Sequence, residues 1–114
     1  MVITGGSAGG AAAYLWSNFI YDKVEHPEGV TIVPDSGIFI GDFPNMYNNK
    51  TMFDHTQELI KLTNEETMMP VHECVRKYPT QKECFSVGFL AQFIKPKVFI
   101  VQSQYDAWGL HNIL

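Results

Sequence analysis

The sequence has 114 residues, a length that suits one domain at most, and 46% of them are hydrophobic while 18% are charged. This balance is typical of a chain that folds around an apolar core, and it excludes an intrinsically disordered segment. The net charge of −4, without a basic cluster, argues against a nucleic-acid partner, and no apolar stretch approaches the roughly 20 residues of a membrane span.

Three short apolar segments predict buried strands. Each is continuously apolar instead of alternating, a pattern typical of a parallel sheet covered on both faces; they are residues 1–4, 30–33 and 98–101. Helices are predicted between them, at residues 11–24, 51–66 and 84–93, whereas residues 69–83 read as polar and irregular. This alternation predicts an α/β fold, and because a sheet of three strands would leave its edges bare, we expect it to be part of a larger one.

The segment Gly5-Gly6-Ser7-Ala8-Gly9 matches the pattern G-x-S-x-G between the first predicted strand and helix. Such a turn strains the serine backbone, exposes its hydroxyl, and uses glycines to let strand and helix approach. We therefore predict Ser7 as a catalytic nucleophile and the Ala8 N–H as a donor to the oxyanion. The alternative is a glycine-rich helix start that only packs tightly or binds a phosphate, although no complete nucleotide-binding motif is present.

Asp106 is the candidate acid of a catalytic triad, because in α/β-hydrolases the acid follows the nucleophile and comes after a later strand. It lies just past the third predicted strand, at the end where catalytic groups gather in open α/β sheets. Its task would be to orient a histidine and stabilise the charged imidazole. An Asp that only caps a loop is the alternative, and Asp35, which also follows a strand, is the rival.

The four histidines do not supply a general base. His26, His55 and His72 precede Asp106, contrary to the expected chain order, and His111 follows it by five residues in what reads as the start of a helix. We interpret all four as surface or structural residues. The base is therefore expected outside this chain, which on its own should be inactive or nearly so.

Cys74 and Cys84 are the two cysteines, and their closeness favours a local disulfide, with two independent buried thiols as the alternative. They are too few for structural zinc, and no metal or organic cofactor is predicted. A disulfide would imply an oxidising compartment. The sequon Asn49-Lys50-Thr51, which makes Asn49 a glycosylation candidate, fits secretion as well.

Four separated motifs, in this order, resemble the pectin acetylesterase/Notum family. They are the run Gly5 to Gly10, then Asp35-Ser36-Gly37-Ile38-Phe39, then Cys74 with Cys84-Phe85, and finally Gln104-Tyr105-Asp106-Ala107-Trp108 with Asn112-Ile113-Leu114. The similarity covers nearly the whole chain and is strongest at its two ends. One departure is Gly6, where plant members often have cysteine, and residues 44–66 match no motif.

The resemblance implies a partial α/β-hydrolase-like fold, with a mainly parallel sheet and flanking helices. Residues 1–114 would be the central part of one such domain, incomplete because the family's histidine comes later and its other oxyanion donors come earlier. Members are secreted, disulfide-bonded serine hydrolases. Carried over by motif, the implied site is Ser7 as nucleophile, Ala8 as oxyanion donor, Asp106 as triad acid and Cys74–Cys84 as a family disulfide.

The resemblance implies that the complete protein removes an acyl group, acetyl in the first instance, from a glycan such as pectin. One alternative is a deacylase like the animal member Notum, which removes palmitoleate from Wnt proteins, or a general esterase. Another is a catalytically dead fragment that only binds a glycan or a partner. A hydrophobic tunnel lined by residues 38–53 would favour long acyl chains, whereas a shallow polar cleft would favour acetyl.

Overall fold

The computed structural model describes residues 1–40, 43–63 and 70–113. Its sheet has three parallel strands in the order β1 (Val2–Gly6), β2 (Thr31–Asp35) and β3 (Lys97–Val98). β1 pairs with the whole of β2, whereas β3 pairs with the first two residues of β2. An isolated parallel bridge between Asp35 and Val101 continues the pairing towards the carboxyl edge of the sheet. The predicted α/β class and parallel sheet are therefore confirmed.

The prediction that all three strands are buried is wrong, because only β2 has a neighbour on each side within the described residues. Ile32 and Pro34 of β2 are buried. By contrast, Val2 at the start of β1 and Phe99 just after β3 are each 66% exposed. Large apolar side chains on an edge strand are the residues that a wider sheet would cover.

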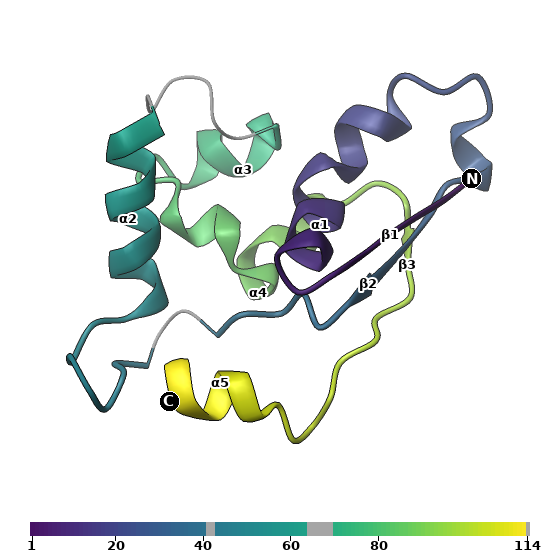
Figure 1. Ribbon diagram of the computed structural model, residues 1–114. Helices are drawn as coiled ribbons and strands as arrows, with labels where there is room; N and C mark the ends of the chain where they lie inside the picture. The colour runs from purple at the N-terminus through teal and green to yellow at the C-terminus, as the bar shows by residue number, and fades with distance from the viewer. Residues whose placement is uncertain (41–42, 64–69, 114) are drawn as a thin grey trace.

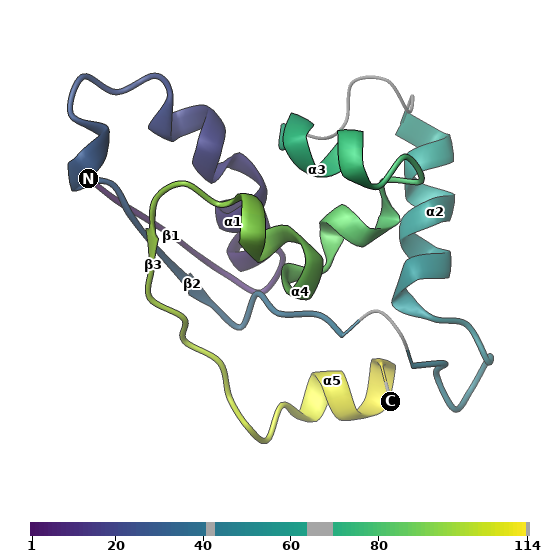
Figure 2. The same cartoon turned by 180° about the vertical axis from the view of Figure 1, so that it is seen from behind.

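Helix α1 (Ala8–Tyr21) packs on β1 and β2. The other helices are α2 (Met52–Thr63), α3 (His72–Lys77), α4 (Val87–Leu90) and α5 (Ala107–Asn112), with 3₁₀ turns η1 (Pro27–Gly29), η2 (Lys82–Phe85) and η3 (Ala91–Phe93). Figures 1 and 2 place α2 and α5 beyond the end at which the strands finish, away from the N-terminus. No helix among the described residues has both the length and the apolar character needed to cross a membrane.

Several helix boundaries differ from the predictions. α1 begins at Ala8 and not at residue 11, because the chain turns into the helix directly after Ser7. The single helix predicted for residues 84–93 is divided, since extended backbone at Ser86 separates η2 from α4. His111 lies in the last turn of α5 and not at its start. α2 matches the helix predicted from residue 51, whose residues 64–66 lie outside the described part of the chain.

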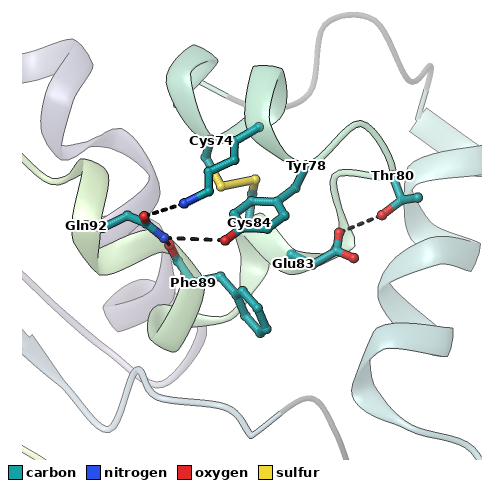
Figure 3. Close-up of a disulfide and its surroundings, with 8 residues drawn as sticks. Cys74, Tyr78, Thr80, Glu83, Cys84, Phe89 and Gln92 are labelled. Carbon is teal, nitrogen blue, oxygen red and sulfur yellow. Dashed lines mark hydrogen bonds between the residues drawn. A yellow bond between two sulfur atoms is a disulfide. The ribbon is translucent and has the colours of Figure 1, made fainter.

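The core lies between α1, β2 and the segment that runs from α3 to α4, with the disulfide Cys74–Cys84 at its centre (Figure 3). The two Cα atoms are 5.9 Å apart and both cysteines are fully buried, which confirms the predicted disulfide over two free thiols. Tyr14 and Ile32 pack against it from α1 and β2, together with Val71, Val87 and Leu90. The disulfide joins α3 to η2, so it holds together a segment that is built from short helical elements.

Asn18 fixes the entry into β3 against α1. Its Nδ2 donates to the Phe93 carbonyl at 2.7 Å, and its Oδ1 accepts from the Lys95 N–H at 2.9 Å. Asn18 is buried, so losing either bond would leave a polar group unpaired at a cost of about 1–3 kcal/mol. The ion pair between Lys95 and Asp22 at 2.7 Å is half-exposed and contributes less. Asn18 therefore sets the position of the chain that continues through β3 towards α5.

Gly10→Ala is expected to lower the free energy of unfolding by roughly 1–3 kcal/mol, the usual cost of overpacking. A Cβ at position 10 would lie 2.7 Å from the Asp35 carbonyl oxygen and 2.9 Å from the Gly37 Cα, and neither backbone atom can move away cheaply. Gly9→Ala is the matched control in the same helical turn. A Cβ there meets nothing within 4 Å, and alanine is the better helix former. Urea denaturation of both variants measures the difference, and equal stabilities would contradict the close approach.

Candidate active site

Ser7 occupies the sharp turn between β1 and α1. Its φ of 53° and ψ of −121° lie where residues with a Cβ are rarely found, at a cost of about 1–3 kcal/mol. The Ser7 N–H donates to the Asp35 carbonyl at 2.9 Å, and the Ser7 carbonyl accepts from the Ala11 N–H at 3.0 Å. The neighbouring strand and the following helix therefore hold the strained turn from both sides.

The Ser7 side chain does not cap the helix that it precedes. A serine in this position ordinarily accepts a hydrogen bond from an N–H two or three residues later. Ser7 makes no such bond, and it is exposed. Its hydroxyl is thus available to a ligand, as the predicted role of Ser7 requires.

Close backbone contacts explain which glycines this turn requires. A Cβ on Gly5 would collide with the carbonyl group of Gly9, and one on Gly37 would collide with the backbone of Gly10. A Cβ on Gly6, in contrast, would meet nothing within 4 Å. The departure from the plant pattern at position 6 therefore does not alter the packing of the turn.

Ala8 is the first residue of α1 and is exposed. The first N–H groups of a helix have no acceptor within the helix, and the helix dipole makes this end partly positive. A negative oxygen that forms next to Ser7 would meet the Ala8 N–H at this end of the 14-residue helix.

An apolar cavity of about 420 Å³ opens beside Ser7. Small side chains of α1 form one wall, larger side chains of α2 face them, and aromatic rings complete the lining; the main contributors are Ala8, Ala11, Ala12, Met52, Phe53, Leu59, Phe39 and Trp108. From the sequence alone, the alanine run predicted a helix but no cavity. In the structure its small side chains leave the space that the cavity occupies.

The position of α2 depends on a reciprocal cap at its start. The N–H and the hydroxyl of Thr51 each donate to Asp54 Oδ2 at 2.8 Å, and the Asp54 N–H donates back to the Thr51 hydroxyl at 3.1 Å. These bonds hold the pKa of the Asp54 carboxyl below its usual range. The capped turn contains Met52 and Phe53, so it also fixes one wall of the cavity.

Asp106 lies at the same edge of the sheet as Ser7, because the strands are parallel and each residue follows the end of one. Its Oδ1 accepts the Trp108 N–H at 3.0 Å, which makes Asp106 the N-cap of α5. The capping role that the sequence offered as an alternative is therefore present. This role leaves Oδ2 of the same carboxylate to bind another donor.

The structure does not place Asp106 in the Ser7 cavity. Asp106 lines a second hollow of about 440 Å³, shared with Ile38 and Ile40. Trp108, two residues later, lines the Ser7 cavity, where its ring packs edge to face on Phe39 with centroids 5.7 Å apart. The two hollows are therefore lined by neighbouring residues of the same two segments, with Phe39 between Ile38 and Ile40 in sequence.

Two other ionisable residues lie near Ser7. Asp35, the rival acid, ends β2 and accepts the Ser36 hydroxyl at Oδ1 over 2.9 Å. His55 is exposed, as predicted, yet it also lines the Ser7 cavity, with Nδ1 3.8 Å from Glu58 Oε2. The position of His55 beside the cavity, on α2, could not be predicted from the order of the motifs along the chain. Across residues 1–40, 43–63 and 70–113, no three His, Cys, Asp or Glu side chains gather as metal ligands.

A parallel sheet with flanking helices and a strained serine between strand and helix define part of an α/β-hydrolase-like fold. The chain belongs to the pectinacetylesterase family, whose model matches residues 1–114. It is 30% identical over 113 residues to pectin acetylesterase 5 of Arabidopsis thaliana and 27% identical over 111 residues to pectin acetylesterase 4. These matches cover 99% and 97% of this chain but 26% of each relative, so the chain spans about a quarter of their length.

Solved structures of the Wnt deacylase Notum from Drosophila have a similar fold. Two crystal forms match with TM-scores of 0.72 and 0.77, at 27% and 26% identity. The matches cover 87% and 96% of this chain and 30% and 32% of the Notum chain. The resemblance to the pectin acetylesterase/Notum family is thereby confirmed.

Replacing Ser7 by glycine is expected to stabilise the protein, because glycine adopts a φ of 53° without a steric penalty. The relief exceeds the extra entropy of an unfolded glycine, so we expect a gain on the order of 1 kcal/mol. Ser7→Ala keeps the Cβ and should give no such gain. Chemical denaturation compares the two variants, and a Ser7→Gly protein no more stable than Ser7→Ala would show that the turn is unstrained.

Proposed function

We propose that Ser7 is the nucleophile of a serine carboxylesterase, and that residues 1–114 are the central part of one α/β-hydrolase-like domain. The observation that carries this proposal is the state of Ser7, whose exposed, uncapped hydroxyl is held in a strained turn beside an apolar cavity. Strain of this kind persists where the surrounding structure maintains it for function. Membership of the pectinacetylesterase family supports the same reading.

In the proposed reaction, Ser7 Oγ attacks the ester carbonyl carbon while a histidine outside residues 1–114 takes its proton. The Ala8 N–H, with a second donor from elsewhere in the protein, stabilises the oxyanion. The alcohol leaves with the proton, and water then hydrolyses the acyl-enzyme with help from the same base. Asp106 would orient that histidine through Oδ2, since Oδ1 is held by Trp108. The mechanism uses no metal or organic cofactor.

As substrate we propose an acetylated polysaccharide such as pectin, with a sugar hydroxyl as the leaving group. The support is similarity to two pectin acetylesterases over nearly the whole chain. We further propose that the protein works outside the cell, because the Cys74–Cys84 disulfide requires an oxidising compartment. Residues 1–114 alone would be inactive or nearly so, since loss of a triad member costs several orders of magnitude.

A longer acyl chain is the second candidate, and one observation favours it. The cavity beside Ser7 measures about 420 Å³, and its lining includes Phe39, Met52 and Phe53 from the segment expected to form a tunnel for long acyl chains. An acetyl group contributes a single methyl to such a space. The similarity in fold to Notum, which is described as a Wnt deacylase, supports the same candidate.

The role of Ser7 is tested by labelling the full-length protein with a fluorophosphonate probe. Ser7→Ala should abolish labelling because the reacting oxygen is gone, and Asp106→Asn should slow it by roughly 10⁴-fold through loss of histidine orientation. Ser36→Ala is the matched control, since Ser36 also has a φ of 53° and also follows a strand. Labelling that survives Ser7→Ala but is lost in Ser36→Ala would assign the nucleophile to Ser36.

The acyl preference is tested with p-nitrophenyl acetate and octanoate. Leu59→Trp fills the cavity, so we expect kcat/KM for octanoate to fall roughly tenfold while acetate is largely unaffected. Leu62→Trp is the control, because Leu62 lies on the same helix, is 83% exposed and does not line the cavity. If Leu59→Trp leaves the octanoate-to-acetate ratio unchanged, the cavity does not hold the acyl chain.

A further inference from the structure

The loop that leads from β2 into α2 carries the sequence Tyr47-Asn48-Asn49-Lys50-Thr51. Asn49-Lys50-Thr51 is the one N-x-S/T sequon of the 114-residue sequence. The residues from Met46 to Lys50 are all exposed. We propose that Asn49 carries an N-linked glycan and that the first sugar of this glycan packs on the ring of Tyr47.

The backbone of the loop presents Asn49 to solvent. Its φ is 55°, a left-handed conformation that asparagine tolerates better than most residues. The Asn49 N–H donates to the Asn45 carbonyl at 2.8 Å, and the Asn45 N–H donates to the Lys50 carbonyl at 2.8 Å. Asn45 is buried, and its Oδ1 accepts the Tyr47 N–H at 2.8 Å. The loop thus closes on Asn45 and holds Asn49 and Tyr47 at its surface.

Tyr47 and Met46 have large side chains that are almost fully exposed, at 79% and 85%. An aromatic ring two positions before the glycosylated asparagine offers a flat apolar face to the C–H groups of a sugar, while the tyrosine hydroxyl remains in water. A glycan at Asn49 would therefore cover apolar surface that the rest of the described chain leaves bare. This is a second observation, independent of the sequon, that favours occupancy.

The modification is a group transfer from an oligosaccharide that is linked to a lipid diphosphate. The Asn49 Nδ2 forms a bond to the anomeric carbon, the bond from that carbon to the diphosphate oxygen breaks, and the amide loses one proton as the lipid diphosphate leaves. The transfer takes place in the secretory compartment, where the Cys74–Cys84 disulfide can also form. In the unfolded chain the Thr51 hydroxyl is free for the transferase, and on folding it donates to Asp54 at 2.8 Å.

Occupancy is tested on the full-length protein secreted from a eukaryotic host, by peptide mapping before and after treatment with peptide-N-glycosidase F. We expect a glycopeptide at Asn49 that the enzyme converts to the corresponding aspartate peptide. Asn49→Asp should remove the glycan, whereas Asn48→Asp, the control one position earlier and outside any sequon, should retain it. Unmodified Asn49 in the secreted, folded protein would overturn the proposal.

Thermal unfolding tests the sugar–Tyr47 contact separately. Tyr47→Ala should lower the Tm of the glycosylated protein by more than that of the deglycosylated protein, because only the former loses the contact. Met46→Ala, at the neighbouring exposed residue, should change both forms equally. If Tyr47→Ala lowers the Tm of both forms equally, the sugar does not pack on Tyr47, even where Asn49 is glycosylated.

Discussion

The contact between the Ser7 turn and the end of β2 is the constraint on which this site depends. The Ser7 N–H reaches the Asp35 carbonyl over 2.9 Å, and Gly10 and Gly37 let the backbones of α1 and the β2 end meet without a Cβ between them. Because β2 satisfies the Ser7 N–H and helix α1 satisfies the Ser7 carbonyl, the strained backbone is held in place and the hydroxyl stays unengaged. The geometry of the Ser7 turn follows from close backbone packing more than from any side chain.

The same packing builds the surroundings of Ser7. Helix α1 leaves the turn with a face of alanines, and this face forms one wall of the cavity. Further along α1, Asn18 binds the last residue of η3 and the chain two residues later, and so guides it into β3. From there the chain reaches Asp106 and Trp108 at the carboxyl edge, where Trp108 meets Phe39 beside Ser7. One helix therefore positions residues from both ends of the chain around one edge of the sheet.

The features predicted correctly from the sequence depend on local patterns. Apolar runs located the strands, although β3 covers Lys97–Val98 and not residues 98–101. The glycines around Ser7 located the turn, and the close spacing of Cys74 and Cys84 indicated their disulfide. The predictions that were wrong concern features that depend on long-range packing. Val2 of β1 and Val98 of β3 are apolar yet exposed because no strand among the described residues lies outside them. Helix α3 forms in a polar segment that the disulfide holds against the core. The sequence allowed both a capping and a catalytic role for Asp106, and the structure shows the capping role, in which Oδ1 accepts the Trp108 N–H.

The most direct measurement is a crystal structure of the full-length protein after reaction with an organophosphate ester. We expect phosphorus bonded to Ser7 Oγ, a phosphoryl oxygen about 3 Å from the Ala8 N–H, and a histidine from outside residues 1–114 between Ser7 and Asp106. Phosphorus bonded to another residue, or an Asp106 carboxylate beyond the reach of that histidine, would contradict the account.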